Sequence, residues 1–90
     1  MRMILNSEVP ARLGDLKPGE CAEIIGFCVE DDLQNYLHRL FEIGFLVGER
    51  VDLLKEAPVS RDPVSIRVKD AVYAMRREEA NLIQVRKIKP

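Results

Sequence analysis

The chain has 90 residues, 47% of them hydrophobic, and this length and composition predict one folded domain and exclude a disordered chain. Its 14 basic and 15 acidic residues give a net charge of −1, which argues against a nucleic-acid-binding domain because such domains usually carry a basic surplus. Nowhere do roughly 20 apolar residues follow one another, as a membrane helix requires, so we expect no membrane insertion. The N-terminus lacks the pattern of a secretory signal peptide, and we therefore expect a cytoplasmic protein.

A turn and a strand are the first elements that the sequence predicts. Proline fixes φ and glycine allows a positive φ, so Pro18-Gly19 fits the centre of a tight turn. Residues 20–29 are predicted to form a strand, in which Gly26 marks a bulge or bend. Cys21 and Cys28 would lie on opposite faces of this strand, roughly 23 Å apart at about 3.3 Å per residue. We therefore expect neither a disulfide nor a shared metal ion at these two cysteines.

The strongest helix prediction covers residues 31–43. Asp31 followed by Gln34 fits a capping box at the start of this helix. Gly44 comes directly after it and can take the left-handed conformation that ends a helix. Phe45 would then fold back toward the last turn. The apolar face of the helix consists of Leu33, Tyr36, Leu37, Leu40 and Phe41, at the spacing of one helical stripe.

Behind the helix the apolar period changes to that of strands. Strands are predicted at residues 49–57, 64–69, 71–76 and 81–88, with at most one turn of helix at residues 76–80. The very short connection Lys69-Asp70 predicts a hairpin.

Together with residues 20–29, these segments make five short strands and one inserted helix. The sequence therefore predicts a mostly β fold, a small β-barrel of about five to six strands. We expect a single domain over residues 1–90 with its core at about 13–88. Residues 1–12 are either a flexible extension or an added strand.

The single histidine offers little catalytic chemistry. His38 lies four residues before Glu42 on the predicted helix, where the two side chains form either a weak site for a divalent ion or a simple ion pair. Nucleophilic catalysis needs a base within reach of a hydroxyl or thiol, and the sequence contains no recognisable triad. We therefore expect a protein that is not an enzyme and that needs no cofactor.

The basic residues toward the C-terminus are interrupted by acidic ones. Glu78 and Glu79 directly follow Arg76-Arg77, and Arg86-Lys87 comes only later. This pattern favours a solvated surface of mixed charge over a nucleic-acid footprint.

The loop at residues 57–63 is the best candidate for a binding site. Loops on a rigid scaffold often carry function, and two prolines reduce the entropy that this loop would lose on binding. The alternative is a plain connector. As partner-contacting residues we select Pro58, Val59, Arg61, Asp62 and Pro63, and as second candidates Tyr36 and Leu37 on the exposed flank of the helix.

Four motifs in order give the chain a resemblance to a known family. L-x-x-L-x-P-G-E begins at Leu13, and R-L-x-E-x-G-x-x-x-G begins at Arg39. A-P-x-x-x-D-P begins at Ala57, and R-R-E-E-A precedes the final strand. With these motifs at compatible spacings, the chain resembles the FeoA family from Leu13 to Val85.

The resemblance implies an SH3-like β-barrel with an inserted helix. It also implies a small cytoplasmic accessory protein of bacterial ferrous iron uptake, which binds and modulates a FeoB-type transporter at its cytosolic region. The alternative is a direct transition-metal binder or iron sensor that uses His38, Glu42 or a cysteine. The family has no settled catalytic or metal-binding residues to transfer, and whether the chain forms a weak homodimer stays open.

One position departs from the family pattern. Family members usually have a glycine in the hairpin near Lys69-Asp70-Ala71. Here we expect Asp70 to take the left-handed position, which aspartate tolerates moderately.

Overall fold

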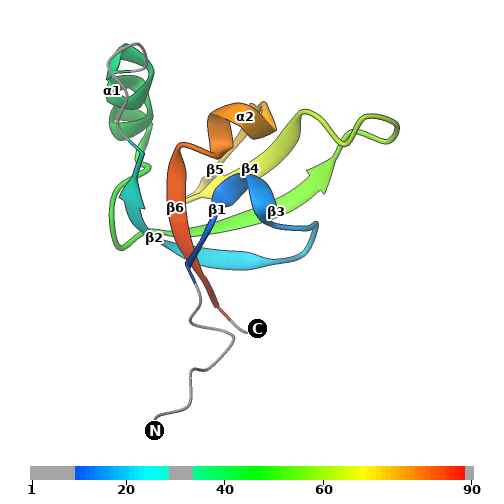
Figure 1. Ribbon diagram of the computed structural model, residues 1–90, viewed down its shortest axis with the longest axis horizontal. Helices are drawn as coiled ribbons and strands as arrows, with labels where there is room; N and C mark the ends of the chain where they lie inside the picture. The colour runs from blue at the N-terminus through cyan, green and yellow to red at the C-terminus, as the bar shows by residue number, and fades with distance from the viewer. Residues whose placement is uncertain (1–9, 29–33, 89–90) are drawn as a thin grey trace, which may run out of the picture.

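One curved β-sheet makes up most of the computed structural model, which describes residues 10–28 and 34–88 (Figure 1). All neighbouring strands are antiparallel, and they follow the order β1-β6-β2-β3-β4-β5. The prediction of a mostly β fold of five to six strands is confirmed. The strands are β1 Pro10–Arg12, β2 Cys21–Phe27, β3 Arg50–Glu56, β4 Val64–Val68, β5 Ala71–Met75 and β6 Ile83–Ile88.

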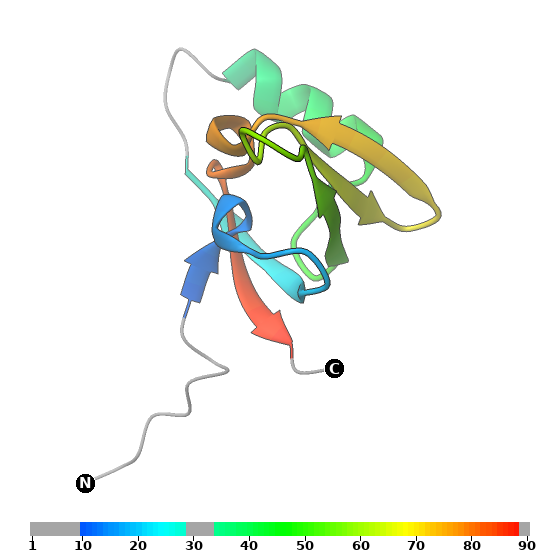
Figure 2. The same cartoon turned by 90° about the vertical axis from the view of Figure 1, so that its right-hand side faces the viewer.

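The sheet curls around its core without closing. Figure 2 shows the curl, and the strand order leaves β1 and β5 at the two ends of the sheet. β1 (Pro10–Arg12) supplies a sixth strand by pairing with β6, whereas residues 1–9 lie outside the described part of the chain. Within residues 10–28 and 34–88, the fold is therefore an open barrel whose sheet has free edges at β1 and β5.

Alternating side chains build the core. In β4, Val64, Ile66 and Val68 are buried and the residues between them point outward, as a strand with one face to solvent requires. The 3₁₀ helix η2 (Leu13–Asp15) and the residue after it bring two further leucines, Leu13 and Leu16, into this core.

The helix α1 (Gln34–Ile43) lies at the top of the sheet in both views (Figures 1 and 2). Its residues Leu37 and Leu40 are buried, and the ring of Phe41 packs edge-on against Phe27 with 4.9 Å between the ring centroids. The predicted capping box needs Asp31, which lies outside the described residues.

Gly44 ends α1 as predicted. Its φ is 121°, and its N–H donates to the carbonyl oxygens of Leu40 and Phe41 at 3.1 Å each. The N–H of Phe45 reaches back to the carbonyl of Leu40 at 3.0 Å. This is the bonding pattern of a Schellman cap, and it directs the fully buried Phe45 into the core.

The β4–β5 hairpin corrects one prediction. Lys69, not Asp70, has the positive φ, at 55°. A two-residue turn with a positive φ at only its first central position is of type II′, which leaves the second position with an ordinary φ. Lys69 Nζ lies 2.9 Å from Glu49 Oε2, and this ion pair helps to hold lysine in the position that glycine would occupy more easily.

The bulge predicted at Gly26 is present in β2, where the pairing register with β6 shifts between Ile24 and Gly26. Cys21 and Cys28 at the two ends of this region are free thiols, the first buried and the second half-buried.

Candidate functional site

The loop between β3 and β4 is closed by its own hydrogen bonds. The N–H of Ala57 donates to the carbonyl of Pro63 at 3.1 Å, and the N–H of Arg61 donates back to the carbonyl of Ala57 at 3.0 Å. The hydroxyl of Ser60 donates to the carbonyl of Asp62 at 2.8 Å. These bonds fix the path of the loop, and Arg61 takes a left-handed φ of 64° within it.

Arg77, the first residue of α2 (Arg77–Ala80), fastens the loop to the sheet. Its main-chain N–H donates to Asp62 Oδ1 at 2.8 Å, and its Nε donates to the carbonyl of Arg61 at 2.9 Å. The Nη2 of the same side chain pairs with Glu56 at the end of β3. One arginine thus anchors both ends of the loop.

The same guanidinium also holds the N-terminal lead-in. Arg77 Nη1 donates to the carbonyl of Gly14 at 2.7 Å and to that of Leu16 at 3.2 Å. The interpretation of Arg77 as part of a solvated surface is therefore wrong. Its side chain is only 23% exposed, and each nitrogen of its guanidinium is hydrogen-bonded. No periodic pattern marks such a residue, since its partners are carbonyls of loops far away in the sequence.

The anchored loop presents most of the predicted contact residues to solvent. Val59 at its tip is 97% exposed, and Pro58, Arg61 and Pro63 are exposed as well. Asp62 is half-buried because its carboxylate bonds to α2. The structure thus brings the predicted residues together on one loop. Asp62 differs from the others because its carboxylate helps to hold the loop to α2.

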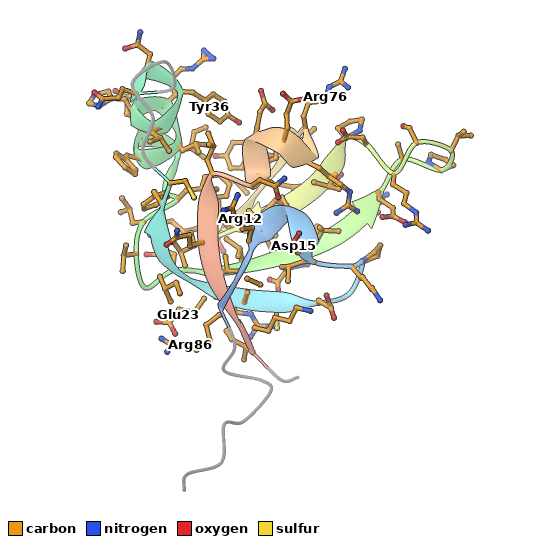
Figure 3. The ribbon with its side chains drawn as sticks, viewed as in Figure 1. Arg12, Asp15, Glu23, Tyr36, Arg76 and Arg86 are labelled. Carbon is orange, nitrogen blue, oxygen red and sulfur yellow. The ribbon has the colours of Figure 1, made fainter. Side chains whose placement is uncertain are left out.

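The second predicted contact pair, on α1, is only in part accessible. Leu37 is 4% exposed, so its expected exposure is wrong; it belongs to the face of α1 that packs on the core. Tyr36 is half-buried and extends from α1 toward α2 (Figure 3), where it lies near Glu79. Burial and then the negative charge of Glu79 raise the pKa of Tyr36 to about 12.

His38 and Glu42 form an exposed pair on α1. His38 Nε2 lies 3.9 Å from Glu42 Oε2, and the two side chains are 76% and 70% exposed. Within residues 10–28 and 34–88, no group of three or more potential ligand side chains comes together to hold a metal ion. The described residues therefore provide two potential ligands at this place and not a complete coordination shell.

The basic residues of β6 are paired with acids. Arg86 Nη2 lies 3.6 Å from Glu23 Oε1, and the two side chains meet in Figure 3. Lys87 Nζ lies 3.6 Å from Glu20 Oε1. The expected surface of mixed charge is confirmed on this strand.

None of the helices in the described segments has the length and apolar character needed to cross a membrane.

A comparison with protein families identifies this fold. The family model "FeoA domain" matches residues 11–87. The chain belongs to the FeoA family. The family links it to ferrous iron transport.

Solved FeoA structures share the fold. FeoA of Stenotrophomonas maltophilia in complex with zinc is 27% identical, with a TM-score of 0.75 over 83% of this chain and 88% of that one. It is described as a prokaryotic SH3 domain protein and a candidate ferrous iron transport activating factor. FeoA of Chlorobium tepidum is 29% identical, with a TM-score of 0.74 over 88% of this chain and 71% of that one. The expected SH3-like fold of this FeoA-family chain is thus confirmed.

A manganese-dependent transcriptional repressor is similar in fold alone. It is 16% identical with a TM-score of 0.75, and the match covers 90% of this chain but 43% of the repressor. A search of curated proteins returned no match to this chain.

Proposed function

We propose that this FeoA-family chain is a non-enzymatic accessory protein that binds the cytosolic region of a FeoB-type transporter and modulates ferrous iron uptake. Its family membership links it to ferrous iron transport, and a relative is described as a candidate activating factor of that transport. The chain would act in the cytoplasm, where it meets the soluble part of the transporter.

The anchored loop at residues 57–63 carries this proposal. Arg77 holds the loop backbone at two points, while Val59 stands 97% exposed at the tip. A loop that is already ordered loses little conformational entropy on binding, so an apolar side chain at its tip can contribute most of its burial to affinity. This combination is the one expected of a docking loop.

Calorimetric titration of the transporter's purified cytosolic region with Val59→Glu tests the proposal. We expect at least about a tenfold loss of affinity, because a carboxylate would replace an apolar contact at the interface. Val47→Glu is the matched control, since Val47 is 64% exposed on the turn after α1, and it should bind like the unchanged chain. Equal binding by Val59→Glu and the unchanged chain would remove the loop from the interface.

Asp62→Lys is a poorer probe of the same loop. The carboxylate of Asp62 accepts the N–H of Arg77 at 2.8 Å. Its replacement would therefore loosen the loop as well as change its surface charge, and a loss of binding would have two causes.

Direct metal binding is the second candidate function, because the Stenotrophomonas maltophilia relative is a zinc complex. His38 and Glu42 are the residues that would contribute, as neighbours on one face of α1. Anaerobic equilibrium dialysis with Fe(II) and Zn(II) distinguishes the two functions. Stoichiometric binding that His38→Ala abolishes would favour the metal-binding function, and an absence of binding would exclude it.

A further inference from the structure

In the part of the chain that the structure describes, the two edge strands of the sheet are protected to different degrees. β1 has three residues, among them Pro10 and Arg12, and shortness, proline and charge all hinder the addition of another strand. β5 has five residues, Ala71–Met75, and contains neither a charged residue nor a proline. An uncharged edge of this length can pair with another strand.

The backbone of β5 leaves two residues open to such pairing. Val68 and Ala71 flank the two-residue hairpin turn, so they exchange both of their main-chain hydrogen bonds, as does every second pair along the ladder. The N–H and C=O groups of Val72 and Ala74 therefore face away from β4.

Arg76 lies two residues after Ala74, so its main-chain groups should face the same way, and its hydrogen bond confirms this orientation. The N–H of Arg76 also faces away from β4, and Glu79 Oε1 accepts it at 2.9 Å. Within the described residues, no side chain bonds to the outward main-chain groups of Val72 or Ala74 in this way. The free edge is therefore confined to β5 and stops where α2 begins.

A groove of about 430 Å³ lies between this edge and α1. Figure 2 shows α1 running alongside β5. Ile43 of α1, which is 37% exposed, lines the groove together with the half-buried Tyr73 and the exposed Ala74 of β5. Tyr36 of α1 and Glu79 of α2 also line the groove. The floor consists of the buried residues Leu40, Phe45 and Met75.

The charges at the rim of the groove favour a basic occupant. Glu42 and Glu79 line it together with a single basic residue, Arg39. The carboxylate of Glu42 is largely exposed and so can approach a cation on a bound chain.

We propose that the groove between α1 and β5 binds an extended segment of a partner protein as an additional strand on β5. The segment places apolar side chains at alternate positions over Ile43 and Tyr73, and it carries a lysine or arginine that faces Glu42 and Glu79. This mode combines main-chain hydrogen bonds, which give affinity, with a few side-chain pockets, which give specificity. It is independent of the loop at residues 57–63, which shares no residue with the groove.

Selection from a displayed library of random short peptides tests the proposal. Peptides that bind the intact chain should share alternating apolar residues next to a lysine or arginine. Backbone N-methylation at the positions that face β5 should weaken them at least about tenfold, because the main-chain donors are lost while the side chains stay. A library that yields no binders, or binders without this pattern, would overturn the proposal.

Two variants of the chain locate the binding. Ala74→Pro removes an outward donor without breaking a bond to β4, and Ile43→Arg puts a cation where the proposal has an apolar contact. Each should lower peptide affinity at least about tenfold. If Ala74→Pro fails to fold, Ile43→Arg is sufficient to test the proposal. Val47→Arg is the control, since Val47 is an exposed apolar residue that does not line the groove.

Undiminished peptide binding by Ile43→Arg would overturn the proposal. Sedimentation velocity of the chain alone provides a further check on the occupant. A dimer that Ala74→Pro dissociates would mean that a second copy occupies the edge, which contradicts a partner segment, whereas a monomer in both cases agrees with it.

Discussion

Gly44 determines at the residue scale how the chain leaves α1. With φ at 121° it satisfies the last carbonyls of the helix and sends Phe45 into the core. A β-carbon added there would lie 3.1 Å from Cε of Lys69, the flexible end of a side chain that can move aside. The backbone conformation, more than space, is therefore what requires glycine.

Gly44→Val should lower the free energy of unfolding by about 1 kcal/mol or more, because a β-branched residue resists a positive φ. Urea denaturation measures this. Gly48→Val measures the cost of the backbone conformation alone, since Gly48 has a φ of 96° and an added β-carbon would have no atom within 4 Å. An unchanged midpoint for Gly44→Val would contradict its place as the helix cap.

Burial and the nearby carboxylate of Glu79 raise the pKa of Tyr36 to about 12. Its folded pKa lies above the value near 10 of an unfolded tyrosine. Between these values the unfolded chain gives up the proton first, so this group makes stability fall as pH rises from about 10 to 12 and contributes no pH dependence below. Ultraviolet titration of tyrosinate should show a step near pH 12 that Tyr36→Phe removes. If Tyr36→Phe instead removed a titration step near pH 10, the result would contradict the burial of this hydroxyl beside Glu79.

Arg77 organises the molecule at the scale of elements. Its side chain bonds to the lead-in, to the end of β3 and to the loop at residues 57–63, so three segments depend on one guanidinium. These segments meet only in the folded chain. Arg77 therefore looks in the sequence like one more surface residue beside Glu78, and its role could not be predicted from pattern.

Arg77→Met should lower the free energy of unfolding by about 2–4 kcal/mol, because it leaves the carboxylate of Glu56 and several carbonyls without their donor. Chemical denaturation measures the change. Arg67→Met is the matched control, since Arg67 is an exposed arginine on β4, and it should change stability by less than about 0.5 kcal/mol. Similar values for the two variants would contradict the anchoring role of Arg77.

Local chemistry made several elements predictable. Gly44 ends α1, Gly26 lies at the bulge of β2, and β4 buries every second residue, all from local sequence. Residue preference favours Asp70 for the left-handed position, because aspartate tolerates it better than lysine, whereas Lys69 takes it in the structure. Leu37 belongs to the predicted apolar stripe, and its burial agrees with the stripe and not with a place on the exposed flank.

The molecule as a whole is an SH3-like sheet that stays open. Five of the six strands and the inserted helix follow from the sequence, whereas the strand β1 and the sheet edges at β1 and β5 required the structure. The candidate loop was predictable from its prolines. The groove beside β5 was not, because residues from α1, β5 and α2 come together only in the folded chain.

Uptake of radiolabelled Fe(II) tests the central claim most directly. Cells that carry a FeoB-type transporter and lack a FeoA protein of their own would receive the unchanged chain, Val59→Glu, or no chain. The account predicts that the unchanged chain alters the initial uptake rate and that Val59→Glu leaves it at the rate without the chain. Equal rates in all three strains, with both proteins present at the same level, would contradict it.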